Sequence, residues 1–164
     1  MPTQAMQDVI GVVRPAEAAD RENTRLLYYD EVELGVLASI RQSRLSLLIT
    51  YLHGSHERDF LQLQSLVGQV DGLLVVDDFL PSQLLVRLAE RVPVVIIAAA
   101  AAERVPPLTT VQQPARLLGE RACTLLIERI SKPGLPPRAE LLATELVPDS
   151  PHAQLTSATP GGLG

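Results

Sequence analysis

The feature that most constrains the fold is a short apolar run that stops at two carboxylates. Leu73 to Val76 are continuously apolar, too short for a helix and half β-branched, and the run ends at Asp77 and Asp78. A strand without polar alternation is typical of a parallel sheet with helices on both faces. Because ligands gather outside the carboxyl ends of such strands, the run also predicts where a site lies.

Other apolar runs repeat this pattern along the first hundred residues and alternate with helical patterns. This rhythm predicts an α/β fold with three layers, α/β/α, and a mainly parallel sheet. We expect residues 14–24 to form a loop, and Ser55 and Pro81 to mark the starts of two helices. The other expected strands are 9–13, 45–52 and 93–98, and the expected helices are 28–42, 55–68 and 81–92.

After residue 97 the rhythm breaks. Five alanines, Ala98 to Ala102, are followed by Pro106 and Pro107, and we take 98–107 as a connector. A short strand at 108–111, a helix from Pro114 to Ile130 and a final strand at 140–147 are expected next. Residues 1–8 are predicted to be a flexible N-terminus, 9–147 one domain, and 148–164 a disordered tail.

Composition narrows the class of protein. The chain has 164 residues, which suits one domain, and its net charge of −5 gives no footprint for DNA or an anionic membrane. The longest apolar run, 92–102, is too short to span a bilayer and contains Pro93. Cys123 is the only cysteine, so no internal disulfide can form. We expect a cytoplasmic protein with no membrane partner.

No constellation of catalytic or cofactor-binding residues is recognisable. Glycine-rich phosphate loops are absent from the sequence, so no cofactor is predicted. His53 and His56 flank a turn without a clear third ligand, so exposed loop histidines are favoured over a metal site. Cys123 falls in a helical register without a neighbouring base, which favours a buried small hydrophobe over a nucleophile. We therefore predict no catalytic residue, no metal and no enzyme.

Asp77 and Asp78 are the best functional candidates by position. Arg14, at the end of the first strand, is expected on the same edge of the sheet, where it could bind a polar ligand with them. Two alternatives stay open. The carboxylates can cap the following turn and helix, and Arg14 can form a surface ion pair worth under about 1 kcal/mol.

Taken together, these segments resemble the effector-binding domain of the lactose-repressor (LacI/GalR) family of transcriptional regulators, which is similar to periplasmic sugar-binding proteins. The resemblance covers residues 9 to about 150. The patches that carry it are Val9-Ile10-Gly11-Val12-Val13, Tyr28-Tyr29-x-x-Val32-x-x-Gly35-Val36, Gln69 to Leu74 with Val92-Pro93-Val94-Val95, Pro107-Leu108-Thr109-Thr110-Val111-x-x-Pro114, Leu118-Gly119-x-x-Ala122, and Thr144-Glu145-Leu146-Val147.

The chain also departs from the family pattern. The family begins with a DNA-reading helix-turn-helix and carries a second lobe where Val105 here joins Pro106. Ala98 stands where the family often has a sugar-binding Asp, and no Arg follows the Glu145-Leu146-Val147 patch. We therefore expect a single lobe of a periplasmic-binding-protein-like type I fold, with an open edge that binds sugars weakly.

The resemblance implies a truncated LacI-type sensor domain that binds a small sugar-like effector or pairs with a fuller regulator. It also implies a homodimer and, without a helix-turn-helix, no direct DNA binding by this chain. The alternative is a degenerate interaction or dimerisation module with no ligand, and an enzyme on a flavodoxin-like sheet is disfavoured. The expected ligand-binding residues are Arg14, Tyr28, Tyr29, Asp77 and Asp78.

Overall fold

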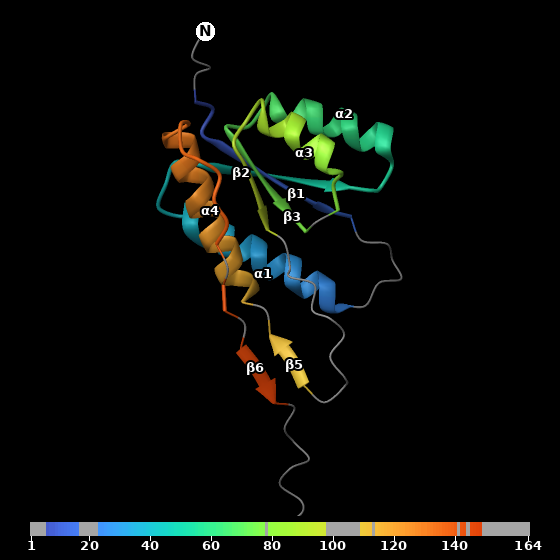
Figure 1. Cartoon of the computed structure of the whole chain (residues 1–164), viewed down its shortest axis with the longest axis vertical. Helices are drawn as coiled ribbons and strands as arrows, with labels where there is room; N and C mark the ends of the chain where they lie inside the picture. Colours follow the sequence, from blue (N-terminus) through green and yellow to red (C-terminus); the bar gives the residue numbers. More distant parts are fainter. Residues whose placement is uncertain are drawn as a thin grey trace, which may run out of the picture.

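The computed structural model describes residues 6–16, 23–77, 79–97, 109–112, 114–140, 142–143 and 145–148. Within these residues the chain alternates strands and helices as far as β4 and then continues as strand, helix and strand (Figure 1). The strands are Val9–Pro15 (β1), Ser46–Leu52 (β2), Gly72–Val76 (β3), Val94–Ile97 (β4), Thr109–Gln112 (β5) and Glu145–Pro148 (β6). The helices are Asn23–Ile40 (α1), His56–Val67 (α2), Ser82–Ala89 (α3) and Ala115–Ser131 (α4).

The first four strands form one parallel sheet in the order β2-β1-β3-β4. Ile10 of β1 pairs with Leu47 on one side and with Gly72 on the other, so β1 and β3 are the inner strands. All five residues of β3 are buried, as their continuous apolar character predicts. The prediction of a parallel α/β sheet is confirmed.

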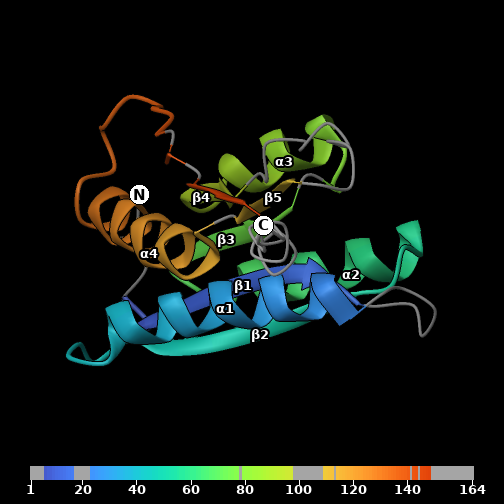
Figure 2. The same cartoon turned by 90° about the horizontal axis from the view of Figure 1, so that it is seen from below.

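Helices cover both faces of this sheet, and each face has its own core. Figures 1 and 2 show α1 and α4 on one side of the sheet and α2 and α3 on the other. Alternation along β1 divides its side chains between the two cores, because successive residues of a strand point to opposite faces. Ile10 and Val12 pack with α1 and α4, whereas Val13 packs with α2 and α3. Arg14, next in the alternation, therefore points toward α1.

A close crossing of two helices fixes the position of α1. A Cβ atom added at Gly35 would lie 2.0 Å from the backbone oxygen of Arg116, and one added at Gly119 would lie 2.1 Å from that of Val32. Any larger residue at either position would push the two backbones apart. The two glycines therefore set how closely α1 lies against α4, and with it where the N-terminal half of α1 meets the sheet.

Two expected boundaries in the first half of the chain are wrong. Strand β1 continues to Pro15 and α1 begins at Asn23, so the predicted loop is shorter than 14–24. Apolar periodicity reports which residues are buried rather than where a helix starts. Leu27, for example, is 65% exposed. The helix becomes periodic only from Tyr28, where it contacts the sheet.

The expected final strand is also too long. Residues 140, 142 and 143 lie outside any strand, and β6 begins only at Glu145. The segment before it follows α4 instead, because Arg121 of that helix hydrogen-bonds to Glu140 (2.8 Å). Strand β6 pairs antiparallel with β5 as a separate ribbon that extends away from the main sheet in Figure 1. Residues 98–108, most of residues 1–8, and residues 149–164 lie outside the described residues, so their predicted roles stay predictions.

Candidate functional site

The carboxyl ends of β1, β2 and β3 meet at one edge of the sheet, which we call the carboxyl edge. On its α1 side lie Arg14 near the end of β1, Tyr51 near the end of β2 and Asp77 directly after β3. Helix α1 adds Tyr28, Tyr29, Asp30 and Glu33 from its N-terminal and middle turns. Four separate elements therefore contribute polar or aromatic side chains to this edge.

Arg14 is enclosed rather than exposed, with only 8% of its surface accessible. Its guanidinium carbon lies 5.3 Å from the centre of the Tyr29 ring and 4.7 Å from that of Tyr51. Its Nε lies 3.0 Å from Glu33 Oε1 without hydrogen-bond alignment, and its Nη1 lies 3.7 Å from Asp30 Oδ1. Arg14 thus has two carboxylate partners, both from α1, and two aromatic rings against it.

The ion pair between Arg14 and Glu33 is partly removed from water. Burial raises the pKa of Glu33 above its ordinary value, Arg14 lowers it, and Asp30 raises it again, with a net upward shift. Burial therefore outweighs the attraction of the guanidinium, as is common for desolvated ion pairs. Without Arg14, the Glu33 carboxylate would be desolvated and uncompensated, so the pair is costly to separate.

Tyr29 joins α1 to the end of β3. Its hydroxyl donates a hydrogen bond to Asp77 Oδ2 (2.9 Å), and its ring is buried, with 3% accessible. Asp77 has a φ of 78°, in the left-handed region that costs energy for most residues but that Asp tolerates better. Backbone conformations of this kind occur at functional sites more often than elsewhere, which makes Asp77 a candidate on conformation as well as position.

Tyr28 lies beside Tyr29, with the two ring centres 5.7 Å apart in an edge-to-face arrangement. Its hydroxyl oxygen is buried and, among the described residues, has no hydrogen-bond partner. Burial, followed by the negative charge of Asp77, raises the pKa of Tyr28 to about 12. The hydroxyl therefore stays protonated and available as a donor at neutral pH.

The structure brings together four of the five expected site residues, namely Arg14, Tyr28, Tyr29 and Asp77. The fifth, Asp78, lies outside the described residues, as does Ala98. The expected pairing of Arg14 differs, since its ion pairs are with two α1 carboxylates, and the pair with Glu33 is sheltered rather than on the surface. Sequence reasoning missed Tyr51, Asp30 and Glu33. Register could have found Tyr51, because it pairs directly with Arg14 between β1 and β2.

Other candidates from the sequence resolve into structural roles. Cys123, a residue of α4, is fully buried in the core between the sheet and the α1 and α4 helices. Burial raises the pKa of its thiol to about 11, as expected for an inert small hydrophobe. Ser55 precedes α2 in an extended conformation but makes no side-chain capping bond. The Asp59 carboxylate instead accepts bonds from the backbone N–H groups of His53 and Gly54, at 3.1 and 2.8 Å.

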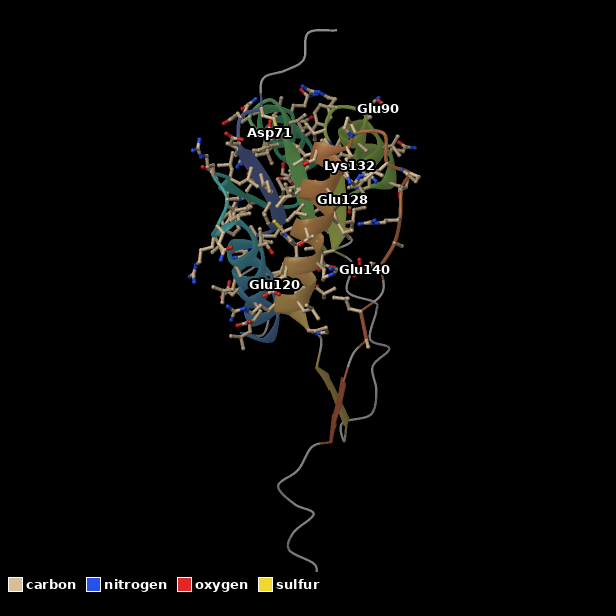
Figure 3. The ribbon with its side chains drawn as sticks, turned by 90° about the vertical axis from the view of Figure 1, so that its left-hand side faces the viewer. Asp71, Glu90, Glu120, Glu128, Lys132 and Glu140 are labelled. Atoms are coloured by element: carbon tan, nitrogen blue, oxygen red, sulfur yellow. The ribbon has the colours of Figure 1, made fainter. Side chains whose placement is uncertain are left out.

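A groove of about 610 Å³ runs between β4, α4, residues 135–140 and Leu142. Ion pairs tie this returning segment to α4, one between Arg121 and Glu140 (2.7 Å) and one between Arg138 and Glu128. Figure 3 shows Glu128 on α4, Lys132 directly after the end of that helix, and Glu140 on the returning segment beside it. The groove is lined along β4 rather than at the carboxyl edge, so it is separate from the candidate site.

The part of the chain that the structure describes holds neither a membrane-spanning helix nor a cluster of metal-ligating side chains. None of its helices combines the length and apolar character needed to cross a membrane. Nor do three or more His, Cys, Asp or Glu side chains gather there in a way that could hold a metal ion.

The parallel sheet and its two helical layers define the class, a three-layer α/β lobe. The model of the periplasmic binding protein-like domain matches residues 10–149, so the chain belongs to that family. This confirms the predicted resemblance to the effector-binding domain of LacI/GalR regulators, which is of this periplasmic-binding-protein-like type. No match was found among curated proteins.

The fold is shared with a solved structure. The transcriptional regulator CelR in complex with cellobiose is similar over 87% of this chain and 84% of its own, with 16% identity and a TM-score of 0.54. Two structures of the LacI family transcriptional regulator CCPA from Weissella paramesenteroides, with bound glucose and with bound sucrose, match at 26% identity and a TM-score of 0.47. These two matches cover 59% of this chain, which spans 34% of theirs.

Proposed function

We propose that this chain is the sensor domain of a LacI-type transcriptional regulator and that it binds a small sugar-like effector, weakly, at the carboxyl edge. The observation that carries the proposal is the grouping of Arg14, Tyr29 and Asp77, from three different elements, at the strand ends of a periplasmic-binding-protein-like domain. Binding by such a domain requires no catalysis, so the proposed function is not enzymatic. A regulator of this kind acts where the DNA is, which places the chain in the cytoplasm.

The chemistry of the edge supports this ligand class. Sugars are recognised by aromatic rings against their apolar faces and by carboxylate or hydroxyl groups on their hydroxyls. The edge supplies both, with the half-exposed Tyr51 ring (42% accessible) and the Asp77 carboxylate. Cellobiose, glucose and sucrose are the ligands named for the structural neighbours and are the first candidates to test.

Thermal shift and calorimetric titration with these three sugars test the proposal. A ligand that binds only the folded state raises the melting temperature, so at least one sugar should stabilise the chain at concentrations up to about 100 mM. Asp77→Asn should weaken that binding, since asparagine tolerates the same backbone conformation but removes the charge. Asp71→Asn changes the opposite end of β3 and should leave the affinity unchanged. No stabilisation by any of the three sugars would refute sugar binding.

A second proposal is self-association, which one feature of α1 favours. Leu27, Leu34 and Leu37 lie on one side of the helix and are 65%, 44% and 43% exposed. Exposed apolar patches of this kind commonly mark contact surfaces, and a symmetric dimer is the simplest assembly. A homodimer or a pair with a fuller regulator would both use this surface.

Sedimentation velocity with two matched variants tests this pairing. Leu34→Glu places a charge in the α1 patch and should shift the chain toward monomer. Leu61→Glu makes the same change at an exposed leucine of α2 (66% accessible) and should not. A wild-type chain that stays monomeric at high micromolar concentration would remove the argument.

A further inference from the structure

We propose that the carboxyl edge accepts uncharged sugars and rejects their phosphate esters and other anions. This inference rests on the proposed function and adds the charge class of the effector. Its basis is the ion pairing of Arg14, which is the cation found on the α1 side of this edge among the described side chains. An arginine at a ligand edge commonly holds an anion, whereas this one is already neutralised by the chain itself.

The balance of charge is the first step. Arg14 contributes one positive charge, and Asp30 and Glu33 contribute two carboxylates beside it. Both carboxylates lie within 3.7 Å of the guanidinium, so its field is offset at short range. Among the described side chains, an incoming phosphate therefore meets a cation that is already paired.

The fixed position of Arg14 is the second step. Tyr29 and Tyr51 stack against its guanidinium, and Tyr29 is itself held by its hydrogen bond to Asp77. Turning the guanidinium toward a ligand would break the contact with both rings. It would also leave the Glu33 carboxylate, whose side chain is only 15% accessible, buried without its partner. A phosphate would have to compensate all of these losses.

An uncharged sugar needs none of these changes. Its hydroxyls can donate to the carboxylate of Asp77 while Arg14 stays with Glu33. Arg14 then acts as a positioning residue, which holds Tyr29 and Tyr51 in place rather than binding the ligand. The edge thus discriminates by charge through a pairing that is internal to the chain.

Calorimetric titration with glucose and with glucose 6-phosphate tests this on the wild-type chain. We expect glucose 6-phosphate to bind at least about tenfold more weakly than glucose, the ratio that corresponds to 1.4 kcal/mol. If the phosphate ester binds as tightly or more tightly, the inference is wrong while sugar binding stands. If neither binds and cellobiose and sucrose also fail, the proposed function fails and this inference with it.

Inorganic phosphate supplies a second test that does not depend on any sugar. At matched ionic strength, phosphate should stabilise the wild-type chain no more than chloride does. Glu33→Gln removes a counter-charge of Arg14 and should create phosphate stabilisation, whereas Glu31→Gln makes the same change at an exposed position of α1 and should not. Asp30→Asn removes the exposed partner and serves if Glu33→Gln folds poorly. Phosphate stabilisation of the wild type, or none in both Arg14-pair variants, would overturn the inference.

Discussion

Replacing Gly119 with alanine tests the helix crossing on which the candidate site depends. The new methyl carbon would lie 2.1 Å from the Val32 carbonyl oxygen, 2.9 Å from its carbon and 3.1 Å from the Val36 nitrogen. Contacts between carbon and oxygen are normally no closer than about 3.3 Å, so α1 must retreat by roughly 1 Å. All three obstructing atoms belong to backbone, which cannot rotate away as a side chain would.

The expected magnitude follows from two opposing effects. Overpacking of this kind costs about 1–3 kcal/mol, and we take the upper end because backbone meets backbone. Alanine is the better helix former by about 1 kcal/mol, which offsets part of the cost. The Gly119→Ala variant should therefore lose about 2 kcal/mol of unfolding free energy.

Urea unfolding followed by circular dichroism measures this loss. Gly134→Ala is the matched control, because a Cβ atom there meets nothing within 4 Å and its φ is not in the left-handed region. The control should stay within about 0.5 kcal/mol of wild type. A Gly119→Ala chain as stable as wild type would show that the two helices do not cross this closely.

Three other predictions follow from burial and charge. Leu74→Asp should abolish cooperative folding, because an unpaired carboxylate in a fully buried position costs several kcal/mol of a total near 5–15, and a soluble variant with a sharp melt would contradict this. The pKa of Tyr28 is raised from 10.0 to about 12, so the stability it contributes is full below pH 10 and lost as pH rises to 12. In Tyr28→Phe, the urea midpoint should therefore fall less as the pH is raised. Both chains should carry Cys123→Ala, because that thiol titrates in an overlapping range. With a net charge of −5, the chain should give no saturable, sequence-dependent gel shift with operator-like duplexes at physiological salt.

Most of the fold could be predicted from the sequence because its strands are buried on both faces. The five residues of β3 and the inner residues of β1 are apolar without alternation, and a parallel sheet between helices is the arrangement that buries them. Element ends were harder to predict. No apolar periodicity marks the start of α1. The segment before β6 is held by ion pairs to α4, which leave no periodic signal.

The candidate site could be predicted only in part, for a reason that Arg14 illustrates. Because both residues come at the ends of strands predicted to be parallel, the sequence alone placed Arg14 and Asp77 on the same edge. The partners of Arg14 depend instead on where α1 lies, since Glu33 and Tyr29 belong to that helix. The length of the segment between β1 and α1 does not determine the position of the helix. Their contact with Arg14 follows from the crossing at Gly35 and Gly119, a distance that no sequence pattern encodes.

That dependence links the helix crossing to the proposed choice of ligand. If α1 moved outward by the roughly 1 Å that alanine at Gly119 demands, Glu33 would move away from the guanidinium and weaken the pair that neutralises it. The attraction between the two charges, now 3.0 Å apart, is inversely proportional to their separation, and water entering between them would reduce it further. The same variant that lowers stability should therefore also make Arg14 more available to anions. While the crossing is intact, Arg14 stays paired with Glu33. When the crossing is loosened, phosphate should begin to stabilise the chain.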